Sequence, residues 1–147
     1  MMVTVRCDKG LLGDLMAGRP DFSPVQDDPV DINILHSPDI KALSEKSRIY
    51  IINGDDFALS RLCAEVCGQV IFCGMGEHCD VTASSIDQDE GEFTLCIRRS
   101  IETLGGRTIE PQEVPLWPMA AQDIGRALLL ATADIVADRD NALQKEQ

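Results

Sequence analysis

One apolar run constrains the fold of this chain more than any other stretch. Residues Ile49-Tyr50-Ile51-Ile52 are β-branched or aromatic, and they stop abruptly at Asn53-Gly54-Asp55-Asp56. A run bounded by turn residues and followed by a helical pattern is typical of a strand buried on both faces of a parallel sheet. Residues 57–67 then repeat apolar side chains at helical spacing, and residues 69–73 are again largely apolar. The pattern therefore predicts a βαβ unit over residues 48–76 with two parallel strands.

Polar side chains follow directly after the first strand of this unit. Ligands of open α/β sheets bind at the carboxyl ends of the strands, and Asn53, Asp55 and Asp56 lie at such an end. Gly74 follows the second strand and would let a ligand approach the backbone closely, because glycine has no side chain. The alternative is that Asn53 to Asp56 only turn the chain and cap the next helix. The spacing leaves both interpretations open.

We expect the whole of residues 1–138 to form a single α/β domain, because 147 residues are enough for one core. Its predicted fold is a mainly parallel sheet with flanking helices plus a small antiparallel β appendage. The expected elements are strands at 3–5 and 30–36, a loop at 18–31, a helix from 37 to about 47, the βαβ unit, the appendage at 80–116, a closing helix at 119–138 and a polar tail at 139–147. Pro111 and Pro115 make the last strand of the appendage an edge strand or a broken one.

Composition narrows the classes of partner. The net charge of −12 argues against nucleic acid and against an anionic membrane surface as partners. No run approaches the ~18 apolar residues of a membrane span, and the first residues lack the pattern of a signal peptide. We therefore expect a cytoplasmic protein whose six cysteines are mostly reduced thiols.

Residues from about 46 to 136 resemble the later part of the ATP-binding central domain of the Mur ligase superfamily. The features that carry the resemblance are Asn53-Gly54-Asp55-Asp56 after an apolar strand, Phe72-Cys73-Gly74, Asp80-Val81 and the small-residue helix over 120–137. The resemblance implies that Asn53 meets the adenine of ATP or another adenine nucleotide, and that Asp55 and Asp56 shape the same site. It also places Lys46 near the position of a lysine that is carbamylated in several members of the family.

The chain departs from the family at the parts that handle phosphate. It contains no G-x-x-x-x-G-K-[ST] loop, and Cys7-Asp8-Lys9-Gly10 has a lysine and a glycine without that spacing. No C-terminal ligase domain follows in this sequence. Phosphoryl transfer depends on those parts, so we do not expect a self-sufficient ATP-dependent ligase, and we identify no catalytic residue.

Three functions remain open. The first is a non-catalytic or partnered module that binds a nucleotide or similar small molecule at the strand ends, through Asn53, Asp55, Asp56, Gly74 and Lys46. The second is one subunit of a split amide ligase, whose second chain supplies phosphate binding. The third is a small metal or redox protein that uses its cysteines, although the sequence contains no C-x-x-C pair and core packing explains Cys63 and Cys73. His78 and Cys79 form the expected exposed reactive pair, and a homodimer is expected to cover the unpaired sheet edge.

Overall fold

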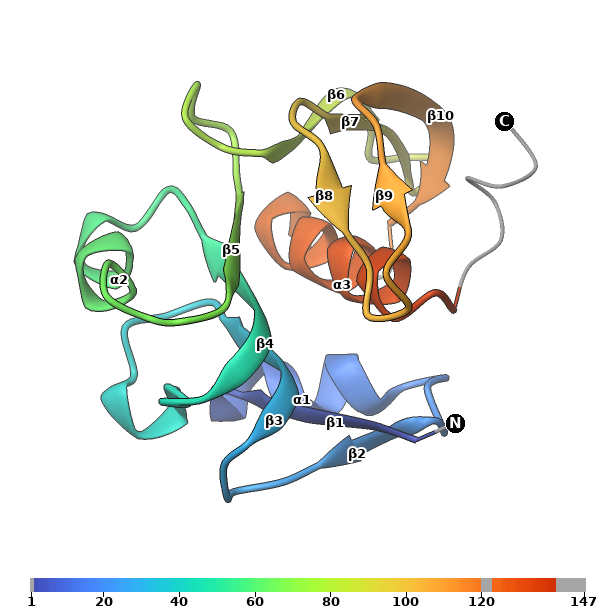
Figure 1. The fold of residues 1–147 in the computed structure, drawn as a ribbon. Helices are drawn as coiled ribbons and strands as arrows, with labels where there is room; N and C mark the ends of the chain where they lie inside the picture. Colours follow the sequence, from blue (N-terminus) through green and yellow to red (C-terminus); the bar gives the residue numbers. More distant parts are fainter. Residues whose placement is uncertain (1, 120–122, 140–147) are drawn as a thin grey trace.

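The computed structural model describes residues 2–119 and 123–139, and they fold around one eight-stranded mixed sheet (Figure 1). Neighbouring strands are parallel from one edge as far as the sixth, and the last two pairings are antiparallel. The α/β class and the mostly parallel sheet are thus confirmed. The strand order is β2 (Phe22–Pro24), β1 (Val3–Cys7), β3 (Val30–Leu35), β4 (Ser47–Asn53), β5 (Gln69–Cys73), β6 (Val81–Asp87), β7 (Glu92–Ile97) and β10 (Gln112–Pro118).

Both faces of the parallel strands are covered, which explains their apolar sequences. Ile49 and Ile51 of β4 point into a large core shared with α1 (Lys9–Met16) and α3 (Ile124–Val136). Tyr50 and Ile52 alternate to the opposite face, where they pack with Leu59 of α2 (Phe57–Leu62). Figure 1 shows α2 and α3 on opposite sides of β4 and β5. Strands β4 and β5 pair in parallel register, so the predicted βαβ unit is confirmed.

The expected helix from 37 to about 47 is wrong. A single 3₁₀ turn, η1 (Ile40–Ala42), is capped by Asp39, which accepts a hydrogen bond from the N–H of Lys41. Buried side chains then hold the following backbone in another conformation: the Asn33 side chain accepts from the N–H of Ser44, and the hydroxyl of Tyr50 donates to the Ser44 carbonyl. These tertiary hydrogen bonds take the backbone groups that a continued helix would need.

The segment expected to be a loop over 18–31 contains the edge strand β2. The N–H of Val3 donates to the Asp21 carbonyl at 2.8 Å, and the N–H of Val25 donates to the Val5 carbonyl at 2.9 Å. Three residues are too few to show a period of two in the sequence. The strand therefore exists only through its pairing with β1.

The antiparallel part is built differently from the expected appendage over 80–116. Strands β6, β7 and β10 continue the main sheet, which they join through one residue pair, Cys73↔Val81. The separate antiparallel sheet is the short pair β8 (Ile101–Glu102) and β9 (Thr108–Ile109). Strand β10 lies at the edge, as Pro115 predicts.

Helix α3 closes the core and begins at Ile124 after its cap, Asp123, which accepts a hydrogen bond from the N–H of Arg126. Residues Ala127 to Ala133 are all buried, so the helix is covered well beyond the predicted apolar stripe. Residues 120–122 of the expected helix and 140–147 of the expected tail lie outside the described residues. Across the described parts of the chain, no helix is both long enough and apolar enough to cross a membrane.

Candidate functional site

Asn53, at the carboxyl end of β4, joins two neighbouring loops. Its side-chain N–H donates to the carbonyl of His36 at 3.0 Å, and its side-chain oxygen accepts from the N–H of Asp55 at 3.1 Å. The first bond reaches the loop that follows β3, and the second shapes the turn that follows β4. Both functional groups of the Asn53 amide thus serve the fold of the carboxyl edge.

Asp55 and Gly74 meet at the same edge. The carboxylate of Asp55 accepts from the N–H groups of Met75 and Gly76 at 2.9 and 3.0 Å, which ties the loop after β4 to the loop after β5. A Cβ atom on Gly74 would lie 2.6 Å from the Asp55 carboxyl carbon, so this approach requires glycine. Asp56 caps α2 by accepting from the N–H of Leu59 at 3.1 Å. The interpretation of Asp56 as a helix cap is therefore confirmed.

Lys46 lies away from these residues. It precedes Ser47, the first residue of β4, whereas Asn53 is the last residue of that strand. A strand rises by about 3.3 Å per residue, so roughly 20 Å of strand separates the two ends. The structure brings Asn53, Asp55 and Gly74 together at one edge of the sheet and leaves Lys46 at the other.

The cysteines do not gather into one site. Cys63 packs on the α2 side of the sheet and Cys73 on the α3 side. Within residues 2–119 and 123–139, no three His, Cys, Asp or Glu side chains are grouped as metal ligands. Cys79 is fully buried, and burial together with the nearby Asp55 carboxylate raises the pKa of its thiol. The expectation that Cys79 is exposed beside His78 is wrong, because the loop folds its sulfur inward, 3.9 Å from Asp55.

The strand order identifies a second candidate binding site at the carboxyl edge of the sheet, where the direction of strand addition reverses. The chain leaves β1 for β2 on one side, whereas β3 pairs on the other side of β1. The connecting helix α1 and the turn η1 consequently leave this point on opposite faces of the sheet. In open α/β sheets such a reversal of strand order opens the crevice in which ligands bind.

A buried carboxylate holds the two loops at this reversal. Asp8, directly after β1, accepts hydrogen bonds from the backbone N–H groups of His36 and Ser37, each at 3.1 Å. It also accepts from the hydroxyl of Ser37 at 2.8 Å. Because Asp8 is 5% exposed, these bonds form a fixed brace between the loop after β1 and the loop after β3.

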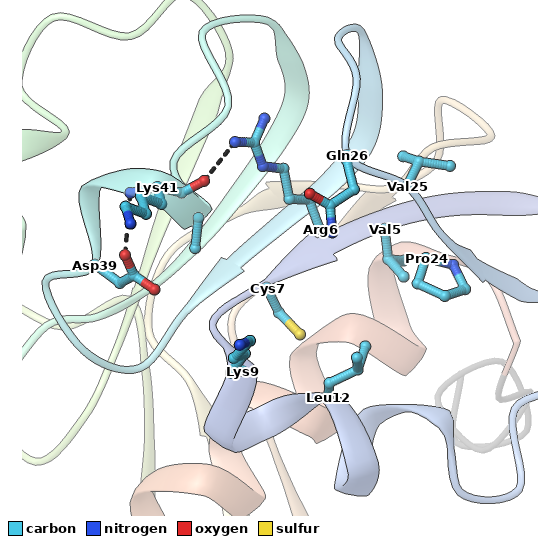
Figure 2. Close-up of a pocket in the computed structure, with 11 residues that line it drawn as sticks. Val5, Arg6, Cys7, Lys9, Leu12, Pro24, Val25, Gln26, Asp39 and Lys41 are labelled. Carbon is cyan, nitrogen blue, oxygen red and sulfur yellow. Dashed lines mark hydrogen bonds between the residues drawn. The ribbon is translucent and has the colours of Figure 1, made fainter.

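An open pocket of about 730 Å³ lies beside this brace (Figure 2). It forms because the pairing of β1 with β2 ends at Val5↔Pro24, whereas β1 runs on through Arg6 and Cys7 beside β3. Figure 2 shows Cys7, Lys9 and Leu12 between a wall that carries Lys41 and Asp39 and a wall that carries Pro24 and Val25. The lining residues are Val5, Arg6, Cys7, Lys9, Leu12, Pro24, Val25, Gln26, Asp39, Lys41 and Ala42.

The pocket contains a guanidinium that the fold holds in place and a cysteine thiol that stays uncharged. The guanidinium of Arg6 donates to the Lys41 carbonyl at 2.5 Å and lies 3.6 Å from the carboxylate of Asp28. Burial, reinforced by the charge of Asp8, raises the pKa of the Cys7 thiol to about 12. Cys7 is therefore a neutral thiol at pH 7 and a poor nucleophile there. The pocket thus combines cationic side chains with a neutral, half-buried sulfur.

The residues of this pocket come from segments that no pattern in the sequence connects. By sequence, Cys7-Asp8-Lys9-Gly10 resembles only an incomplete phosphate loop, and Lys41 is predicted to lie in a helix that does not form. The signal in the sequence is a lysine, Lys9, shortly after a first strand, and it does not show which strands are neighbours. The reversal of strand order is a property of the folded sheet.

No family model, no curated protein and no solved structure matches this chain. The resemblance to Mur ligases therefore stays a prediction made from residues 46–136.

Proposed function

We propose that this chain is a small-molecule-binding α/β module whose ligand lies in the pocket at the reversal of strand order. The observation that carries the proposal is the pocket itself: about 730 Å³ at the carboxyl ends of β1 and β2. Binding sites for small molecules commonly measure about 300–1,000 Å³ and combine apolar walls with a few polar groups. Leu12 and Val25 supply apolar surface here, and Arg6 and Lys41 supply charge.

The resemblance to Mur ligases supports a narrower proposal, with an adenine nucleotide as the ligand and a second chain that handles its phosphates. Its site would be Asn53, Asp55, Asp56 and Gly74, and the structure supports it in that Asn53, Asp55 and Gly74 meet at one edge. Against it, the amide of Asn53 and the carboxylate of Asp55 already bond the chain's own loops. We therefore place the ligand at the pocket first. A split ligase and a homodimer stay predictions.

Amide chemical shifts distinguish the two locations. The ¹⁵N-labelled protein is titrated with a library of small fragments, and then with ATP and ADP with and without magnesium. We expect ligand-induced shifts at Cys7, Lys9 and Lys41. Shifts confined to Asp55, Met75 and Gly76 would support the nucleotide site instead, and no shift at either place would overturn both proposals.

A pocket-filling variant supplies the control. Leu12 lines the pocket and is 37% exposed, so the ring of Leu12→Trp has room to occupy part of the cavity without entering the core. We expect this variant to abolish the shifts at Cys7 and Lys41. Ile86→Trp adds the same ring at an equally exposed residue of β6, 38% exposed, and should leave them unchanged.

A further inference from the structure

The pocket reverses the charge of the chain locally. The whole sequence has a net charge of −12, yet the pocket is lined by three cationic side chains, Arg6, Lys9 and Lys41, and one carboxylate, Asp39. Grouped charges of one sign in a concave surface concentrate the electrostatic potential there. Asp28, which lies 3.6 Å from Arg6, and Asp8, beside Cys7, offset part of this positive charge, so any attraction for an anion comes from Lys9 and Lys41.

The two lysines are available to a ligand. Both side chains are exposed, and neither forms an ion pair with any residue that the structure describes. Arg6 differs, because Asp28 and the Lys41 carbonyl already engage its guanidinium. The charge of Arg6 is thus offset by the carboxylate of Asp28, whereas Lys9 and Lys41 keep their ammonium groups free to donate to an incoming oxygen.

The lysines also come from separate elements that the fold holds apart. Lys9 is the first residue of α1, and Lys41 is the middle residue of η1. Asp8 braces the loops that lead to these two elements. The carboxylate of Asp39 accepts from the backbone N–H of Lys41 at 3.0 Å, so it helps to fix the turn that presents Lys41. Such bracing lowers the entropy that binding would otherwise cost.

We propose that the pocket recognises a small organic anion, with its phosphate or carboxylate group between Lys9 and Lys41 and an apolar body against Leu12, Pro24 and Val25. The inference rests on the proposed function, since it names the class of ligand for that same pocket. Phosphate and carboxylate share the recognising chemistry, an oxyanion that accepts charge-assisted hydrogen bonds from ammonium groups. The apolar walls favour a ligand with a ring or short hydrocarbon part over a bare inorganic ion.

The test compares matched probes. Phenyl phosphate and benzoate carry an anionic group on one ring, and benzamide carries a neutral group on the same ring. Dissociation constants are measured by following the amide shift of Cys7 in NMR titrations at low and at physiological salt. We expect either anion to bind more tightly than benzamide, and added salt to weaken the anion alone. The anion that binds more tightly shows whether the pocket prefers a phosphate or a carboxylate group.

Charge-neutralising variants assign the effect to the lysines. Lys9→Gln combined with Lys41→Gln should weaken binding of the preferred anion by about tenfold or more, the size expected for losing charge-assisted hydrogen bonds, and leave benzamide unchanged. The control, Lys46→Gln combined with Lys9→Gln, removes the same total charge but leaves Lys41 in place, so it should weaken binding less. All three lysines are exposed, so the variants should fold.

The outcomes separate the two proposals. If benzamide binds as tightly as both anions, or if the Lys9/Lys41 and Lys9/Lys46 pairs behave alike, anion recognition between the two lysines is wrong while the pocket remains a binding site. If none of the probes or library fragments shifts Cys7, Lys9 or Lys41, the pocket is not a binding site and the proposed function fails with it.

Discussion

Asp28 shows how one exposed carboxylate supports a wall of the pocket. It accepts hydrogen bonds from the hydroxyl of Ser44 and, at 3.2 Å, from the N–H of Glu45, and it lies 3.6 Å from the guanidinium of Arg6. The hydrogen bond from Ser44, with smaller contributions from Glu45 and Arg6, lowers the pKa of Asp28 below its usual value of 3.8. The charged form of Asp28 is therefore favoured by folding.

This lowered pKa predicts a specific dependence of stability on pH. A carboxylate with a lower pKa in the folded state contributes stability above its unfolded pKa, and the contribution is lost as pH falls through the folded value. We expect the difference in unfolding free energy between the wild type and Asp28→Asn to be constant above about pH 5. Below pH 3.8, the usual value for this group, the difference should shrink.

Urea unfolding across this range measures the difference. Asp27→Asn changes the exposed carboxylate next in the chain and serves as the control. The assignment would be contradicted if the advantage of the wild type over Asp28→Asn grew on acidification, or if Asp27→Asn reproduced the same profile.

Strand β10 contains an irregularity that lets two apolar residues with the wrong spacing for a regular strand be buried on the same face. Val114 and Trp117 are both buried, each 6% exposed, although they are three positions apart and a regular strand would place them on opposite faces. The pairing of β10 with β7 shifts register between these two residues. Within that irregularity Leu116 adopts φ 60° and is 72% exposed. The bulge thus buries both side chains, but it forces the backbone of Leu116 into the left-handed region, which is unfavourable for leucine.

Replacing Leu116 by glycine should remove the backbone strain and raise the unfolding free energy. Glycine adopts a positive φ without the cost of about 1–2 kcal/mol that other residues meet, but it loses about 0.5–1 kcal/mol in chain entropy. We expect Leu116→Gly to raise the unfolding free energy by about 0.5–1 kcal/mol, measured by urea denaturation.

The reverse change provides the control. Gly91 has φ 67°, and a Cβ atom added there would meet nothing within 4 Å. Gly91→Ala should therefore lose about 1 kcal/mol through backbone strain alone. Equal destabilisation by Leu116→Gly and Gly91→Ala would show that the left-handed conformation of Leu116 carries no strain.

At the scale of the whole molecule, a chain of charges joins the N-terminal segment to the last helix. Arg19 contacts Asp134 of α3 at 2.8 Å, and Asp134 also pairs with Arg139 at 2.8 Å. Arg139 in turn contacts Asp21 at 2.8 Å. The side chain of Arg19 is 8% exposed and that of Asp134 is 16% exposed, so water screens this contact weakly.

Removal of the shared carboxylate should therefore be costly. Asp134→Asn leaves the buried guanidinium of Arg19 without its counter-charge, and breaking a buried pair on one side typically costs about 3–5 kcal/mol. We expect the loss of unfolding free energy to lie near the lower end of that range, because the side chain of Arg139 can turn to water.

Asp14→Asn is the control. The carboxylate of Asp14 lies 3.3 Å from Arg126, and the side chains are 41% and 35% exposed. This pair should contribute less than about 1 kcal/mol. Similar losses in the two variants, compared by thermal or urea unfolding, would contradict the structural role of Asp134.

Several local features followed from the sequence because they depend on neighbours in the chain. The apolar run over 49–52 predicts a strand buried on both faces, and Asp56 is a good cap for the helix after it. That helix is predicted over 57–67, and the structure ends it at Leu62. Asn53, Asp55 and Gly74 meet as predicted because the carboxyl ends of adjacent parallel strands share an edge. Whether they bind a nucleotide stays a prediction.

The rest was decided by contacts between residues distant in sequence. Buried Asn33 and Tyr50 prevent the helix expected before β4, and pairing with β1 creates β2. Lys46 precedes the strand that ends at Asn53, so its distance from Asn53 follows from the strand itself, although the resemblance placed both residues in one site. Above all, the order of the strands sets α1 and η1 on opposite faces and so opens the pocket between Lys9 and Lys41. Hydrophobic periodicity predicts which residues are buried. Which strands become neighbours depends on how all the buried faces pack together, and only the tertiary structure shows that order.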